Sequence, residues 1–156
     1  MNELRIELYQ PVYLRDFVRL NLEWIQTFFH LESSDRVVLN DPERYILKQG
    51  GQIFFAVNGQ GKPVGCCALI KHAPEGYYEL AKMAVSPQYQ GRGIGTLLGE
   101  ALLAYAREHE VRKIVLEGNT RLASSIALYR KLGFQEVPNL NAAYERCNIK
   151  MELNIV

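Results

Sequence analysis

The chain has 156 residues, 48% of them hydrophobic, which suits one ordinary domain, residues 1–156, with a single buried core. Its 18 lysines and arginines nearly balance 17 aspartates and glutamates, so no strong net charge favours nucleic acid or an anionic membrane as partner. The sequence contains neither an apolar signal core near its N-terminus nor a long uncharged apolar run, so we expect a cytoplasmic protein without a membrane partner.

The predicted elements follow from periodicity and from residues that begin or end them. Pro11 suits the first turn of a helix, Asp41 before a proline is an N-cap, and Gly133 suits a left-handed C-cap. Residues 58–61, Asn-Gly-Gln-Gly, are typical of a hairpin turn. The predicted order is strand 4–9, helix 11–29, helix 42–48, strands 52–57 and 64–70, a strand ending near 85, a helix from about 93, strand 113–117, helix 122–132, and a strand pair near 134–138 and 144–154.

This order of elements predicts the fold class. Strands and helices mix along the chain, so we expect an α/β fold with a mixed, largely antiparallel sheet of about six or seven strands and helices on both faces. The three cysteines are odd in number and show no metal-ligand spacing, so we expect neither a disulfide framework nor a metal site. Cys66 and Cys67 are interpreted as small core residues of a strand.

The stretch from Met83 to Gly99 joins an apolar strand to a glycine-rich turn that opens into an amphipathic helix. The apolar residues after the turn recur at helical spacing, which places the helix start near Gly93. Glycines have no Cβ, so the turn can lie against a ligand, and the N–H groups of a first helical turn have no intrahelical acceptors. The helix dipole and Arg92 favour negative charge here, which indicates a phosphate site.

Two familiar glycine motifs fit this turn poorly. A Walker loop fails because no Gly-Lys-Ser or Gly-Lys-Thr follows. A dinucleotide fingerprint fits loosely, since Gly93, Gly95 and Gly99 have a similar spacing and Glu117 ends a later strand. Residues 86–90 separate the strand from the first glycine, however, and too little chain follows to build the rest of a doubly wound sheet.

The spacing that fits is Gln-Gly-Arg-Gly-Ile-Gly at residues 90–95, which resembles the Gln/Arg-x-x-Gly-x-Gly/Ala signature for acetyl-CoA in the GNAT N-acetyltransferase superfamily. A second block, residues 126–134, resembles the family's Ala-Leu-Tyr-x-Lys-x-Gly-Phe helix end. Two ordered blocks are more specific than either alone. Leu122 departs from the pattern, since many members have an asparagine there.

The resemblance implies that acetyl-CoA binds as cosubstrate, without a metal, where the fourth and fifth strands diverge. It implies that the strand backbone near Met83 and Val85 binds the pantetheine and the thioester carbonyl, and that the glycine turn holds the pyrophosphate. Asn119 or Ser124 would substitute for the missing asparagine. The implied cofactor-binding residues are Met83, Ala84, Val85, Gln90, Gly91, Arg92, Gly93, Ile94, Gly95, Thr96, Asn119 and Ser124.

The resemblance also implies two catalytic residues. An ordinary lysine-like amine has a pKa near ~10.4, so a base helps to form the neutral nucleophile. Glu79 resembles the general base of several members; the alternative is a solvated glutamate paired with a neighbouring strand. Tyr129 matches a tyrosine often assigned as the general acid that protonates the leaving thiolate; the alternative is a half-buried core residue at helical spacing.

The acceptor is expected to be a primary amine of a small molecule or of a peptide or protein, acetylated directly in a ternary complex. Residues 32–43 carry an acidic excess that would attract a cationic amine, or simply supply caps and loop charges. Alternatives are a non-catalytic acetyl-CoA-binding regulatory module and the use of a longer acyl-CoA. Homodimers are common among proteins that resemble this one. Four aromatic side chains are expected either to line an apolar acceptor pocket or to belong to the core: Trp24, Phe28, Phe29 and Tyr45.

Overall fold

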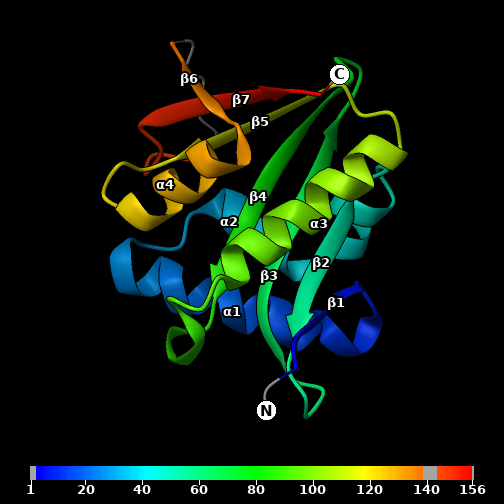
Figure 1. The fold of residues 1–156 in the computed structure, drawn as a ribbon, viewed down its shortest axis with the longest axis vertical. Coiled ribbons are helices and arrows are strands. Elements are labelled where there is room, and N and C mark those ends of the chain that lie inside the picture. The colour runs from blue at the N-terminus through cyan, green and yellow to red at the C-terminus, as the bar shows by residue number, and fades with distance from the viewer. Residues whose placement is uncertain (1–2, 139–143, 156) are drawn as a thin grey trace.

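The computed structural model describes residues 3–138 and 144–155, which form a seven-stranded sheet in the order β1-β2-β3-β4-β5-β7-β6 (Figure 1). All neighbouring strands are antiparallel except β4 and β5, which are parallel. The predicted mixed, largely antiparallel sheet is therefore confirmed. The strands are β1 (Arg5–Leu8), β2 (Gln52–Val57), β3 (Pro63–His72), β4 (Tyr77–Val85), β5 (Lys113–Gly118), β6 (Gln135–Val137) and β7 (Ile149–Asn154).

Helices cover both faces of this sheet, as predicted. In Figure 1, α3 (Ile94–Glu108) crosses in front of β2, β3 and β4, whereas α1 (Leu14–Phe28) and α2 (Ser33–Asn40) lie behind them. The front face holds a buried cluster that includes Leu98 and Leu102 of α3 and Tyr129 of α4 (Ala123–Leu132). The back face holds a second cluster with Phe17 of α1 and Phe55 of β2. The two clusters are the apolar layers that fix the helices to the sheet.

Most predicted boundaries agree with the structure, and the local reasons hold. The N-terminal helix begins with a 3₁₀ turn, η1 (Pro11–Tyr13), and Gly93 and Gly133 flank α3 and α4 in left-handed conformations. The predicted helix at 42–48 is a single π-helical turn, η2 (Glu43–Leu47), and Asp41 Oδ1 accepts a hydrogen bond from the Arg44 N–H at 3.2 Å. None of the helices in residues 3–138 and 144–155 is both long and apolar enough to cross a bilayer.

Two predictions about element placement are wrong. Helix α2 lies in the acidic segment 32–43, for which the sequence predicts no helix. Its N-terminus is stabilised by a reciprocal cap in which Glu32 and Asp35 each accept from the other's backbone, so acidic residues replace the usual serine or threonine. The last strand begins at Ile149 and not near residue 144, because residues 144–148 form a turn. It also pairs with β5 on one side and β6 on the other.

The parallel pair β4 and β5 creates the gap that positions the site. The two strands register only at Tyr78 with Ile114 and at Glu79 with Val115, and beyond these pairs they diverge towards the glycine turn (Figure 1). A bulge in β4 accompanies this divergence: its register with β3 shifts by one residue, and Lys82 has φ 56°. The backbone from Leu80 to Val85 therefore has one edge that β5 does not cover.

Candidate active site

A cavity of about 590 Å³ occupies the gap between β4 and β5. It runs from the glycine turn past the strand edge to the α1 side of the sheet. Glu79 and Tyr129 both line it, although they stand on β4 and α4. All the predicted cofactor-binding residues line it except Arg92. The structure therefore brings two separated sequence blocks to one cavity.

The glycine turn presents free backbone donors to this cavity. Gly91 and Gly93 have φ of 77° and 78°, a region that residues with a Cβ rarely adopt, and no atom lies within 4 Å of where a Cβ would stand. The first helical hydrogen bond runs from the Leu97 N–H to the Gly93 carbonyl at 3.0 Å, so the N–H groups of the first turn have no intrahelical partner. Such an N-terminus suits a phosphate group.

Gly95 lines the cavity, as predicted, and it also has a role in helix packing. A Cβ at Gly95 would lie 2.9 Å from Leu128 Cδ2 of α4, and a Cβ at Gly99 would overlap Leu132. These two glycines allow α3 and α4 to pack closely. The glycine pattern therefore serves helix packing as well as the turn.

The polar side chains of the turn are held by local contacts. Gln90 Nε2 donates to the Val85 carbonyl at 3.2 Å, which ties the turn to the end of β4. The Arg92 guanidinium is exposed and lies 5.0 Å from the centre of the Tyr89 ring. Arg92 is thus placed near the turn but outside the cavity lining.

Tyr129 is 8% exposed and belongs to the front core cluster, where its ring contacts Phe134 edge-on at a centroid distance of 6.2 Å. Burial raises the pKa of the Tyr129 phenol above its ordinary value, so the hydroxyl keeps its proton at neutral pH. Both interpretations of this residue hold in part, since it is a core residue that also lines the cavity. Its assignment as general acid stays a prediction.

Glu79 lies on the opposite, back face, beside Ile70 of β3. Its Oε1 lies 2.7 Å from His72 Nε2, and the ring of His72 stacks on Tyr77 at a centroid distance of 4.7 Å. The hydrogen bond to Glu79 raises the pKa of His72. Glu79 therefore pairs with a residue of a neighbouring strand, as the alternative to the general-base assignment predicts, and it also lines the cavity. Sequence reasoning missed His72.

Asn119 and Ser124, the two proposed substitutes for the missing asparagine, differ in the contacts that their side chains make. Asn119 Nδ2 donates to the Arg146 carbonyl at 2.6 Å, and its Oδ1 accepts from the Arg121 N–H at 2.8 Å. The Asn119 side chain therefore shapes the loop before α4. Ser124, in the first turn of α4, also lines the cavity and is exposed.

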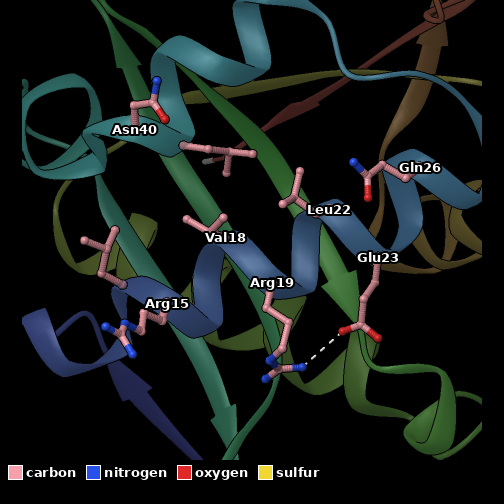
Figure 2. Close-up of a pocket in the computed structure, with 9 residues that line it drawn as sticks. Arg15, Val18, Arg19, Leu22, Glu23, Gln26 and Asn40 are labelled. Atoms are coloured by element: carbon pink, nitrogen blue, oxygen red, sulfur yellow. Dashed lines mark hydrogen bonds and ion pairs between the residues drawn. The ribbon is translucent and has the colours of Figure 1, made fainter.

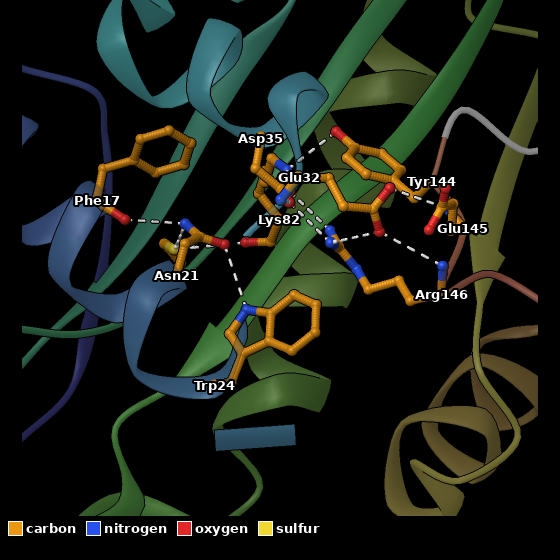
Figure 3. Close-up of polar contacts among 10 residues, drawn as sticks. Phe17, Asn21, Trp24, Glu32, Asp35, Lys82, Tyr144, Glu145 and Arg146 are labelled. Atoms are coloured by element: carbon orange, nitrogen blue, oxygen red, sulfur yellow. Dashed lines mark hydrogen bonds and ion pairs between the residues drawn. The ribbon is translucent and has the colours of Figure 1, made fainter. Parts of the chain in front are cut away.

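A buried ion cluster lies beside α2 (Figure 3), and its Lys82 and Arg146 line the cavity. Asp35 is fully buried; it accepts from Lys82 Nζ at 2.7 Å and from both terminal nitrogens of Arg146 at 2.7 Å. Burial alone would raise the pKa of Asp35, but these hydrogen bonds hold it at about 2. Glu32 also pairs with Arg146, at 3.4 Å. Part of the acidic excess of residues 32–43 is thus neutralised by ion pairs inside the protein.

The cysteines are placed as core residues rather than as nucleophiles. Cys66 and Cys67 are fully buried, and burial raises the pKa of Cys66 to about 12 and that of Cys67 above its ordinary value. Neither thiol forms an appreciable thiolate at neutral pH. Cys147 lines the cavity, and burial raises its pKa to about 11.

A second, open hollow of about 620 Å³ lies on the outer side of α1 and beside the end of α2 (Figure 2). Two of its charged side chains pair with each other, since Arg19 Nη1 lies 3.0 Å from Glu23 Oε1. It shares no lining residue with the cavity between β4 and β5.

Comparisons with known proteins agree with this geometry. A family model described as the acetyltransferase (GNAT) family matches residues 11–134. An N-acetylaspartate synthetase from Xenopus tropicalis is 34% identical over 108 residues, which are 69% of this chain and 40% of that protein. The chain thus spans less than half the length of this relative.

Solved structures match the fold over nearly the whole chain. A GNAT-family acetyltransferase from Staphylococcus aureus Mu50 has a TM-score of 0.87 at 23% identity, with 97% of this chain and 99% of that chain covered. A GNAT-superfamily phosphinothricin acetyltransferase from Sinorhizobium meliloti, solved with acetyl-CoA, has a TM-score of 0.78 at 17% identity, with 97% and 88% covered. At these identities the likeness shows the fold.

Proposed function

Because the chain belongs to the acetyltransferase (GNAT) family, we propose that it is an acetyl-CoA-dependent N-acetyltransferase that transfers the acetyl group directly to a primary amine. One observation carries this proposal. A single cavity connects the free N–H groups of the glycine turn with the Tyr129 hydroxyl on one face of the sheet and the Glu79 carboxylate on the other.

The residues present fit acetyl-CoA as cosubstrate. The first turn of α3 offers N–H donors to the pyrophosphate, and the open space at Gly91 and Gly93 lets the phosphates approach the backbone. The uncovered edge of β4 from Leu80 to Val85 offers backbone groups to the pantetheine and to the thioester oxygen. When bound, acetyl-CoA supplies the activated acyl group.

Glu79 and Tyr129 divide the proton transfers. As the C–N bond forms, Glu79 accepts the proton that the amine releases, directly or through a water. As the C–S bond breaks, the Tyr129 hydroxyl gives its proton to the leaving thiolate, and the tyrosinate regains a proton from solvent. The raised pKa of Tyr129 makes its proton harder to give and easier to regain, so the transfer occurs as negative charge develops on the sulfur. The products are the N-acetyl amide and CoA.

Direct transfer is favoured over an acetyl-cysteine intermediate. Such an intermediate needs a thiolate, and burial keeps Cys66 and Cys67 protonated. Cys147 has a smaller pKa shift but is also held as the thiol at neutral pH. A ternary complex of protein, acetyl-CoA and amine requires none of them.

The test is a calorimetric titration with acetyl-CoA followed by a thiol-release assay with polyamines, amino acids, aminoglycosides and lysine peptides. We expect binding, and free CoA thiol with one class of amine. Binding without thiol release by any class would favour a regulatory module that senses acetyl-CoA. Absence of binding would overturn the assignment of the cavity. Repeating the assay with longer acyl-CoA thioesters measures the acyl preference.

A further inference from the structure

The end of the cavity nearest α1 and α2, which we call the acceptor end, is lined by side chains of both charges. Three cations line it, Lys82, Arg121 and Arg146, together with two carboxylates, Glu79 and Glu117. Aromatic rings of α1 and the turn before β7 complete its walls. A cavity that accepted a plain alkylamine would need no cation in its lining.

Lys82 and Arg146 are fixed in place and still have donors to spare. The Lys82 side chain is 3% exposed, and within the described residues its Nζ donates to Asp35 and, at 3.0 Å, to the Tyr144 hydroxyl (Figure 3). An ammonium group has three N–H donors, so one remains. Arg146 is 8% exposed, and its terminal nitrogens donate to Asp35 and Glu32, which leaves the Nε donor and one N–H of Nη2.

Arg121 is the cation of the lining whose charge is not balanced by a carboxylate in the part of the chain that the structure describes. Its Nη1 donates to the Phe28 carbonyl at 3.4 Å, and its guanidinium lies 5.2 Å from the centre of the Phe29 ring. These contacts tie the Arg121 side chain, which precedes α4, to the end of α1. Its remaining N–H donors suit a planar carboxylate.

The two carboxylates come from neighbouring strands of the sheet, β4 and β5. Glu79 registers with Val115 of β5, and Glu117 is two residues further along that strand, so both side chains leave the same face of the sheet. Glu117 has no ion pair among the residues that are described, whereas Glu79 contacts His72. This side of the acceptor end suits the cationic amine before it loses its proton.

From this arrangement we propose that the acceptor carries a carboxylate as well as an amine, as a free amino acid does, and that Arg121 is the residue that selects it. The proposal rests on the proposed function and names its substrate class. Glu79 and Glu117 receive the ammonium end. Arg121 pairs with the carboxylate, and the spare donors of Lys82 and Arg146 extend the same anion-binding wall.

The experiment compares amino acids with their amides, for example glycine with glycinamide and phenylalanine with phenylalaninamide. The ratio of kcat/KM for acid over amide is measured in the wild-type protein and in Arg121→Gln. Amides differ from acids in amine pKa, but this difference is the same for both proteins and cancels when the ratios are compared. Arg130→Gln is the matched control, because Arg130 is 55% exposed and outside the cavity lining.

We expect Arg121→Gln to lower the acid-to-amide ratio by at least about tenfold, since hydrogen bonds to charged groups are the stronger class. Arg130→Gln should leave the ratio unchanged. An unchanged ratio in Arg121→Gln, or amides accepted by the wild type as well as acids, would overturn the proposal.

A calorimetric titration of the CoA-loaded protein with the same amino acids separates this proposal from the proposed function. Binding of acids that Arg121→Gln weakens at least about tenfold, without any thiol release, would support carboxylate selection and overturn the transferase assignment. If no acid binds and none is turned over, the carboxylate proposal is overturned. If the protein acetylates only amines that lack a carboxylate, the carboxylate proposal is overturned and the proposed transferase function stands.

Discussion

His72 Nε2 lies 2.7 Å from Glu79 Oε1, and this contact joins a cavity-lining carboxylate to a histidine whose side chain is 35% exposed. The two residues come from neighbouring antiparallel strands, with His72 next to the turn that joins them. A proton that reached Glu79 would therefore have a short route to solvent through the partly exposed His72. The contact suits a general base that must return to its charged form after each turnover.

Replacing Glu79 with glutamine tests this role. Glu79→Gln keeps the size of the side chain but cannot accept the amine proton, so we expect kcat/KM to fall by about 10²-fold or more. The pH–rate profile of the variant should also differ from that of the wild type. Glu136→Gln, at a side chain 60% exposed outside the cavity, is the control. An unchanged pH–rate profile in Glu79→Gln would exclude the base role.

His72 predicts a pH dependence of stability. The hydrogen bond to Glu79 raises the pKa of His72, and Glu75, Glu117 and Tyr77 are the other titratable groups beside its ring. Because the folded protein binds this proton more tightly, the contribution is fully present below the unfolded pKa of about 6.5 and is lost as the pH rises through the higher folded pKa. The free energy of unfolding should therefore gain more on acidification in the wild type than in His72→Gln.

The measurement is urea denaturation of both proteins at about pH 5 and about pH 9. Glutamine can still donate to Glu79, so the hydrogen bond is kept while the titration is removed. Equal pH dependence in the two proteins would show that His72 does not contribute through its proton.

Tyr129→Phe removes the hydroxyl and keeps the ring that packs in the core. We expect kcat to fall by about 10²-fold while the Kd for acetyl-CoA, measured by calorimetry, changes little. Tyr105→Phe is the matched control, because that ring packs against Phe54 and does not line the cavity. Full activity in Tyr129→Phe would assign Tyr129 to the core alone.

The glycine turn and most elements were predictable because their signals are local. The start of α3 at Gly93 follows from the spacing of the apolar residues after it, and the end of α4 follows from Gly133. The turn at Asn58 also behaves as its residues predict, with Asn58 Oδ1 accepting from the Lys62 N–H at 2.9 Å. Each of these features depends on a few consecutive residues.

The rest depends on contacts between distant residues. Lys82 and Asp35 are 47 positions apart and Arg146 and Asp35 are 111 apart, so no spacing rule indicates that they form one cluster. Helix α2 was missed because Glu32 and Asp35 looked like surface charge, although both are consumed by caps and ion pairs. The packing role of Gly95 depends on Leu128 of α4, which the sequence does not place beside it.

Gly93 and Gly61 provide a matched pair for the phosphate site. Both have φ of 78°, and neither has an atom within 4 Å of a built Cβ, but only Gly93 lines the cavity. Valine at either position carries the same backbone strain. We expect Gly93→Val to abolish acetyl-CoA binding, because its side chain would occupy the approach to the first-turn N–H groups. Gly61→Val should bind normally in the same titration. Retained binding by Gly93→Val would refute the phosphate assignment.

Asp35 should contribute strongly to the free energy of unfolding, because it is the buried partner of both Lys82 and Arg146. Asp35→Asn leaves Lys82 and Arg146 buried with too little negative charge, and loss of one partner from a buried ion pair typically costs about 3–5 kcal/mol. Asp16→Asn removes a partly exposed partner of Arg19 and should cost at most about 1 kcal/mol. Urea denaturation near neutral pH measures both. A loss as small for Asp35→Asn as for Asp16→Asn would show that solvent compensates the two cations.

Acid titration gives the same residue an independent readout. The folded pKa of Asp35 is about 2 against an ordinary 3.8, so its contribution is present above pH 3.8 and is lost as the pH falls through about 2. Asp35→Asn lacks this carboxylate and should lose correspondingly less stability over that interval. Adding Lys82→Met to Asp35→Asn should cost less than the two single changes together, because the double variant no longer buries an unpaired ammonium. Additive costs would mean that the Lys82–Asp35 contact carries no coupling.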